Sequence, residues 1–198
     1  MSKTKPQLIL ASQSAARQSL LKNAGLVFKA VPAQLDEDAF HRKHIPTRDI
    51  ALELAKAKAL SVAQTHKDAL VIGADQILEF EGALVTKAAS KKEAREKLGA
   101  FRGKTHKLIS AVSVVKAGTI LWSVSDEAQL SMHNLSDDVL DLYCEKAGDA
   151  LTACVGSYAL EERGSWLFSA VKGDYFTVLG LPLLPLLAYL REYHGVTP

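Results

Sequence analysis

The chain contains few cysteines and no cysteine pattern that would hold a metal. Only Cys144 and Cys154 occur among the 198 residues, and no CxxC or other metal-ligand spacing is present. We therefore expect two buried thiols, with neither a disulfide framework nor a cysteine-ligated metal. Hydrophobic residues make up 48% of the chain, which supplies a core that needs no such support.

Long hydrophobic runs are also missing. The most apolar segment, residues 179–190, is interrupted by Gly180, Pro182 and Pro185, and it falls short of the ~20 residues of a membrane span. The first apolar run, residues 8–11, is too short for the hydrophobic region of a signal peptide. These features predict a cytoplasmic protein with no membrane partner.

A concentrated stripe of one charge is likewise absent. Lys and Arg total 24 against 22 Asp and Glu, and both signs are spread along the whole chain. Because nucleic-acid-binding proteins usually carry a basic patch, we expect no nucleic-acid partner. The chain also lacks repeats, low-complexity tracts and an obvious linker, which favours one domain over residues 1–198.

The start of the chain predicts a turn that suits a phosphate group. Apolar residues 8–11 indicate a buried strand, and residues 15–24 have helical spacing. Ser12 and Ser14 lie between the two, and Arg17 falls in the first helical turn. Backbone N–H groups at a helix N-terminus, together with an arginine, favour a bound anion. The alternative is an ordinary serine N-cap, with Arg17 on a solvated face.

Carboxylates follow the second predicted strand and interrupt the third. Residues 36–38, Asp-Glu-Asp, form a loop after a strand at 27–31, where they could bind a hard cation or simply be solvated. Asp75 and Gln76 interrupt the apolar strand at 69–78. A buried acid is costly unless it is paired or binds metal, so Asp75 is the strongest functional candidate. A structural carboxylate that caps a neighbouring loop is the alternative.

The remainder of the chain alternates between helices and strands. The predicted elements are a helix over 47–64, a hairpin through 81–82, a helix over 90–100 with Ser90 and Glu93 as a capping box, two strands joined at Gly118, a helix over 136–147, a strand over 166–171 and a helix after Pro182. This pattern predicts an α/β protein.

Several motifs, in the same order along nearly the whole chain, resemble the Maf-like nucleoside triphosphate pyrophosphatase family, known from the septum formation inhibitor Maf. The motifs are L-I-L-A-S-Q-S-A-A-R at 8–17, L-D-E at 35–37, L-A-K-A-K-A at 54–59, I-G-A-D-Q at 72–76, G-K-T-H at 103–106 and G-D-Y…V-x-G-L-P at 173–182. The resemblance implies a single bilobed α/β fold of the Maf and inosine-triphosphatase type, with a curved mixed sheet flanked by helices and a central cleft. It also implies cleavage of a nucleoside triphosphate to the monophosphate and pyrophosphate, by water attack at the α-phosphorus, with Mg²⁺ or Mn²⁺.

The resemblance also assigns roles to individual residues. Asp75 is the implied general base, and Glu37 and Asp75 are the implied metal ligands. The implied substrate-binding residues are Ser12, Ser14, Arg17, Lys58, Gln76, Lys87 and Glu161. Gln76 and Glu161 are similar to the branch that acts on 7-methyl-GTP, and a carboxylate such as Glu161 can accept hydrogen bonds from a guanine edge.

Some positions depart from the family pattern. Ala15 and Ala16 replace a proline and the residue after it, Thr86 and Ala88 flank Lys87 in place of Gly and Pro, and Ser110 begins a variant of T-G-V. These departures leave a second function open, a nucleotide-binding regulator of cell division or septation with little catalysis. A homodimer is compatible with the sequence, but no motif demonstrates one.

Overall fold

The structure is a computed structural model of the chain and describes residues 6–41 and 45–197. Its elements are β1 (Leu8–Leu10), α1 (Ala15–Asn23), β2 (Phe28–Ala30), α2 (Asp38–His41), α3 (Thr47–Ala63), β3 (Leu70–Phe80), β4 (Ala83–Val85), α4 (Lys91–Phe101), β5 (Thr105–Lys116), β6 (Thr119–Met132), α5 (Asp137–Lys146), α6 (Ala150–Ala153), the 3₁₀-helix η1 (Arg163–Leu167), β7 (Phe168–Lys172), α7 (Tyr175–Val178) and α8 (Leu183–His194).

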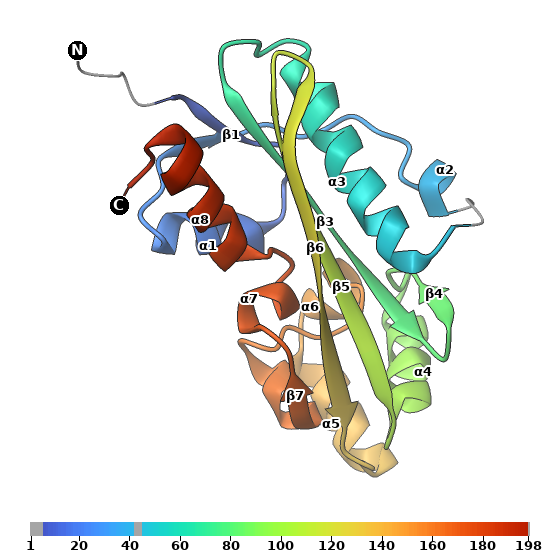
Figure 1. Cartoon of the computed structure of the whole chain (residues 1–198). Helices are drawn as coiled ribbons and strands as arrows, with labels where there is room; N and C mark the ends of the chain where they lie inside the picture. Colours follow the sequence, from blue (N-terminus) through green and yellow to red (C-terminus); the bar gives the residue numbers. More distant parts are fainter. Residues whose placement is uncertain (1–5, 42–44, 198) are drawn as a thin grey trace. The chain divides into compact units, whose positions relative to one another are not determined.

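The strands of the described residues form one mixed sheet of seven strands (Figure 1). The order is β2-β1-β3-β5-β6-β7, and β4 pairs with the end of β3. Strand β1 runs parallel to both β2 and β3, whereas β3 with β4 and β6 with β7 are antiparallel. Helices flank the sheet, so the predicted α/β class with a mixed sheet is confirmed.

The chain forms two compact units. The first unit contains the described residues of 1–76, 110–126 and 180–198, and the second contains 77–109 and 127–179. Strands β3, β5 and β6 contribute residues to both units. Each unit has its own cluster of buried apolar side chains. The central cleft that the family resemblance implies stays a prediction.

The core of the first unit follows from the alternation of side chains along its parallel strands. Ile9 of β1 and Val71 of β3 pack with Ala59 and Val62 of α3. Residues at alternate positions in between face the opposite side of the sheet, where α1 and α8 lie (Figure 1). Both faces of β1 and β3 are therefore covered, which is why these strands are apolar without interruption.

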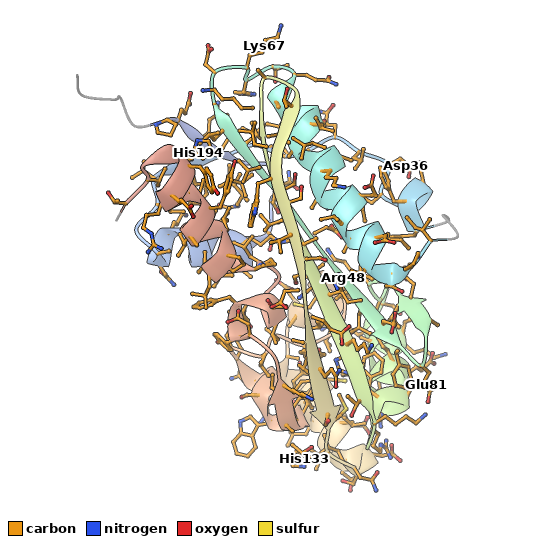
Figure 2. The ribbon with its side chains drawn as sticks, viewed as in Figure 1. Asp36, Arg48, Lys67, Glu81, His133 and His194 are labelled. Carbon is orange, nitrogen blue, oxygen red and sulfur yellow. The ribbon has the colours of Figure 1, made fainter. Side chains whose placement is uncertain are left out.

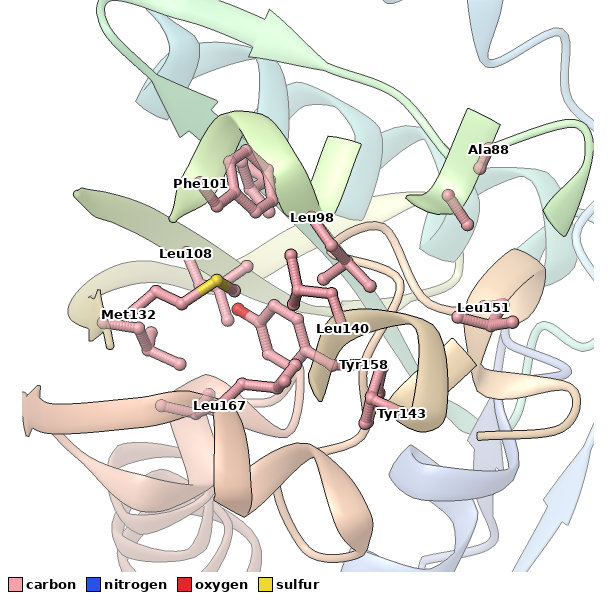
Figure 3. Packing of buried hydrophobic residues seen from close by; sticks show 14 of the residues in the cluster. Ala88, Leu98, Phe101, Leu108, Met132, Leu140, Tyr143, Leu151, Tyr158 and Leu167 are labelled. Carbon is pink, nitrogen blue, oxygen red and sulfur yellow. The ribbon is translucent and has the colours of Figure 1, made fainter. Parts of the chain in front are cut away.

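The core of the second unit contains a buried histidine. Tyr158 lies in the middle of this cluster (Figure 3), and its hydroxyl is hydrogen-bonded to Nε2 of His106. The imidazole also stacks on Phe101, with ring centroids 4.7 Å apart. His106 is 1% exposed, and burial lowers its pKa from the ordinary value of 6.5 to about 4. The folded protein therefore holds this imidazole neutral.

Most predicted elements occur near their predicted positions, but the strand predicted over 166–171 is wrong at its start. Trp166 lies in η1 and is 83% exposed, and β7 begins at Phe168. The reason is a tight turn at Gly164, whose N–H donates to the Ala159 carbonyl at 3.0 Å. A Cβ at Gly164 would lie 2.3 Å from that oxygen, so the backbone packs closely here, within η1, and the strand begins only after it.

Every helix within residues 6–41 and 45–197 is too short or too polar to cross a membrane.

The neutral His106 predicts a loss of stability in acid. The unfolded chain takes up a proton below about pH 6.5, whereas the folded chain resists protonation until about pH 4. The free energy of unfolding should therefore fall by about 2 kcal/mol between pH 7.5 and pH 5 through this group alone. Urea unfolding of the wild type and of His106→Gln at the two pH values measures the contribution as a difference. His66→Gln, at a partly exposed residue, is the control and should keep the wild-type pH dependence. The prediction would be contradicted if the free energy of unfolding changed equally between the two pH values in the wild type and in His106→Gln.

Candidate active site

The turn between β1 and α1 has the predicted serine arrangement. Ser14 is the N-cap of α1, and its Oγ accepts a hydrogen bond from the Arg17 backbone N–H at 3.4 Å. Ser12 Oγ accepts from the Ser14 N–H at 3.2 Å. Each hydroxyl oxygen thus faces the backbone, which leaves its own hydrogen to donate to another acceptor. No acidic residue lies in the first turn of α1, so the positive end of the helix dipole is not offset there.

Arg17 lies buried at the same turn. Its Nε donates to the Gly180 carbonyl at 2.8 Å, and its Nη1 donates to Ser12 Oγ at 3.4 Å. Burial lowers the pKa of Arg17, and the carboxylates of Asp75 and Glu37 act in the opposite direction. An arginine remains charged under these conditions. The Arg17 guanidinium is therefore a positive charge held in place beside the two serines. The alternative prediction, with Arg17 on a solvated face of the helix, is wrong.

Helix α3 packs against β3 with its backbone unusually close. Gly73 makes this possible, because a Cβ there would lie 2.2 Å from the Ala55 carbonyl oxygen and 2.6 Å from the Ala59 nitrogen. Strand alternation places Asp75, two residues later, on the face that α3 covers. Lys58 lies on α3 between the two alanines that border Gly73, and its side chain meets Asp75.

Lys58 pairs with two carboxylates. Its Nζ lies 2.6 Å from Asp75 Oδ1 and 2.8 Å from Glu37 Oε1. The Lys58 and Asp75 side chains are 10% and 8% exposed, whereas that of Glu37 is 48% exposed. The Glu37 carboxylate therefore reaches a mostly buried ion pair from the solvent side. The structure thus brings both predicted metal ligands, Glu37 and Asp75, together with Lys58, a predicted substrate-binding residue.

The acidic loop contributes one of its three members to this ion pair. Glu37 contacts Lys58, whereas Asp36 Oδ1 accepts a hydrogen bond from the Ala39 N–H at 3.3 Å on the loop that leads into α2 (Figure 2). Asp38 begins α2, and its Oδ1 lies 3.7 Å from Nδ1 of His41. The loop is therefore organised by short local contacts that leave Glu37 to face α3.

Gln76 lies on the other face of β3. Its Nε2 donates to Ser110 Oγ at 3.1 Å, and a Cβ at Gly180 would lie 3.7 Å from its Oε1. Gln76 is thus near the carbonyl that holds Arg17. Ser110, which departs from the threonine of the family pattern, retains the hydroxyl that this hydrogen bond requires.

The other two predicted site residues, Lys87 and Glu161, belong to the second unit. Both lie near Cys154, where burial and the charge of Glu161 raise the pKa of the thiol and Lys87 acts against them. Their roles toward a substrate stay predictions.

The ligand set of the first unit fits a hard divalent cation. Among the described side chains, no three or more His, Cys, Asp and Glu converge on a metal position. Glu37 and Asp75 nevertheless converge on a single ammonium, and two carboxylate oxygens are the donors that Mg²⁺ takes when water and phosphate supply the remainder.

Comparisons with known proteins place the chain in a family. The model of the Maf-like protein family matches residues 7–193, so the chain belongs to this family. A protein of Caulobacter vibrioides named "Nucleoside triphosphate pyrophosphatase" is 49% identical over 95% of this chain and 96% of its own length. One of Nitrobacter winogradskyi with the same name is 48% identical over 93% of both chains. A solved HAM1 protein from Coxiella burnetii has a TM-score of 0.42 at 17% identity, covering 66% of this chain and 74% of its own.

Two glycines position the site, and the sequence alone did not indicate their roles. Gly73 lets the backbone of α3 pack closely against β3. Gly180, with φ of +96°, presents the carbonyl that accepts a hydrogen bond from Arg17. Their signal in the sequence was a glycine inside an apolar strand and a glycine in the G-L-P motif. Neither pattern identifies the partner, because α3 and Arg17 are brought there by the fold.

Gly73→Ala should destabilise the protein through a steric clash with α3. The added Cβ meets backbone atoms, which cannot rotate away, so we expect a loss of roughly 1–3 kcal/mol or more in the free energy of unfolding. Chemical denaturation measures the loss. Gly99→Ala in α4 is the control, because the nearest atom to its added Cβ is Nη1 of the flexible Arg95 side chain at 3.3 Å. That variant should be neutral or slightly more stable. Equal stability of Gly73→Ala and the wild type would contradict the packing argument.

Proposed function

We propose that this chain hydrolyses a nucleoside triphosphate to the monophosphate and pyrophosphate. The observation that carries the proposal is the Lys58 ion pair with Asp75 and Glu37 in the same unit as the Ser12 and Arg17 turn. The names of the relatives at 48–49% identity support the same reaction. The proposal therefore rests on the chemistry of the site and on family membership together.

The charges in the first unit indicate what the substrate must bring with it. Arg17 and Lys58 supply two positive charges, which Asp75 and Glu37 offset. A triphosphate carries about four negative charges, so these side chains alone leave it without compensation. A divalent cation held by Glu37 and Asp75 would supply positive charge to the phosphate oxygens. Ser12 and Ser14 would donate hydrogen bonds to the same oxygens, and Arg17 would orient them.

Asp75 is the general base in this proposal. One of its oxygens accepts from Lys58 Nζ, and the other can accept a proton from water. Attack of that water at the α-phosphorus breaks the bond to the β-phosphate and releases pyrophosphate. Phosphoryl transfer depends mainly on placement and on electrostatic stabilisation, and a buried, oriented carboxylate contributes to both.

Asp75→Asn should remove most of the activity and leave the fold intact. The amide has the same shape but neither the charge nor the basicity, and the loss of such a group typically lowers the rate about a hundredfold or more. The assay separates pyrophosphate from orthophosphate after incubation with Mg²⁺ or Mn²⁺ and a nucleoside triphosphate. Asp68→Asn, at an exposed residue before β3, is the matched control. Near-normal turnover of Asp75→Asn would remove this residue from the mechanism.

Tight nucleotide binding by the wild type without any pyrophosphate would instead support a regulator with little catalysis.

We further propose 7-methyl-GTP or another modified nucleotide as the substrate, with Glu161 recognising the base. A carboxylate accepts hydrogen bonds from the guanine edge and attracts a cationic methylated base. Glu161→Gln retains the size of the side chain and removes the charge. It should lower kcat/KM for 7-methyl-GTP about tenfold or more relative to dTTP and UTP. Glu162→Gln, at the neighbouring exposed residue, is the control. An equal loss for all three nucleotides would argue against a role in base selection.

A further inference from the structure

We propose that Lys58 is the built-in counter-ion of the metal site, and that it must leave one or both carboxylates before a divalent cation can bind there. The inference rests on the proposed function, because it takes Glu37 and Asp75 as metal ligands. It adds that the nucleotide-free protein binds the cation weakly, because the Lys58 ammonium competes for the same carboxylates. It also adds that the cation and the nucleotide bind cooperatively.

The geometry carries the first step. One atom, Lys58 Nζ, lies 2.6 Å from Asp75 Oδ1 and 2.8 Å from Glu37 Oε1. A divalent cation held by Glu37 and Asp75 would take carboxylate oxygens that the ammonium contacts, and its charge would lie next to that of the ammonium. Two positive centres that close repel strongly, above all where the Lys58 and Asp75 side chains are about nine-tenths buried. The ammonium and the metal therefore compete for the same two oxygens.

The two cations of this site differ in their freedom to move. Arg17 is held by the Gly180 carbonyl and by Ser12, and a planar guanidinium loses these bonds if it turns. Lys58 carries its charge on a flexible four-carbon chain, and its partners are the two carboxylates. A metal ion that takes the carboxylates frees the ammonium, and a bound triphosphate offers it new acceptors. The lysine is thus the movable charge of the site.

This exchange couples two binding events. Without nucleotide, the cation must displace an ammonium that then has no anionic partner. With nucleotide, the displaced ammonium pairs with phosphate oxygens, so the cation binds more tightly. Because such coupling is reciprocal, the cation must tighten nucleotide binding by the same factor. A purely structural ion pair, which only neutralises Asp75, predicts no such coupling through Lys58.

The test measures Mn²⁺ binding directly, from the signal of the free ion in electron paramagnetic resonance, without any turnover. In the absence of nucleotide, Lys58→Met should bind Mn²⁺ about tenfold or more tightly than the wild type, because the competing charge is gone. Lys58→Arg, which keeps the charge, should stay close to the wild type. The control is Lys56→Met, which removes a lysine of the same helix that pairs with Glu53 at 2.9 Å. It should leave the affinity unchanged.

A second measurement compares Mn²⁺ binding with and without nucleotide, and its wild-type part does not depend on the folding of a variant. A non-hydrolysable nucleoside triphosphate analogue should raise its Mn²⁺ affinity about tenfold or more, and Lys58→Met should lose most of this coupling. Circular dichroism establishes that each variant is folded. Should Lys58→Met unfold, Lys58→Gln takes its place, because a neutral amide can still donate to both carboxylates.

The outcomes separate the inference from the proposed function. Equal or weaker Mn²⁺ binding by folded Lys58→Met or Lys58→Gln would overturn the inference, as would equal wild-type affinity with and without the analogue. Neither result would affect pyrophosphate release by the wild type. Conversely, tighter binding in the lysine variant, combined with no pyrophosphate from any nucleotide, would retain the counter-ion role and reject the hydrolase.

Discussion

The first unit depends on the contact between the backbones of α3 and β3 at Gly73. A side chain at this position would have to occupy the space of the Ala55 carbonyl and the Ala59 nitrogen. The close approach has a direct chemical consequence, because Asp75 follows on the same strand face and Lys58 lies between the two alanines on the helix. A helix held farther away by a larger residue would leave the Asp75 carboxylate buried without its ammonium, which is strongly unfavourable. The Lys58–Asp75 ion pair therefore depends on the close packing of α3 against β3 at Gly73.

The turn between β1 and α1 is also held by a distant segment of the chain. Arg17 follows β1, and the carbonyl that holds it belongs to Gly180, 163 residues later. Gly180 adopts a positive φ, so the carbonyl direction depends on a conformation that other residues rarely take. The motif G-L-P thus acts through its backbone. This explains how a segment without any ionisable side chain can bear on the electrostatics of the site.

The sequence was sufficient for the long helices, for the central strands and for the identity of the buried acid, but not for the partners of that acid. A continuous apolar run located β3 and the Ser90 capping box located α4, since these signals are local in the chain. The interruption of an apolar strand by Asp75 showed that this residue required a partner. That the partner is Lys58 depends on the approach of α3, which involves residues 17 positions apart and a glycine with no side chain. Trp166 was misplaced for a similar reason, because the turn at Gly164 depends on its contact with Ala159.

The ion pair also bears on the two interpretations of Asp75, structural and functional. A carboxylate that only needs neutralising is satisfied by one ammonium, yet Lys58 is shared with Glu37, which is half exposed and has solvent available to it. An exposed carboxylate gains little from such a pair, since its charge is already solvated. The convergence of a second acid on the buried pair therefore goes beyond what stability requires. Together with Lys58, the two carboxylates carry one net negative charge, and they act on Arg17 in the turn before α1. This separation of charge is what a metal-bound polyphosphate would complement, with its cation at the acids and its oxygens at the turn.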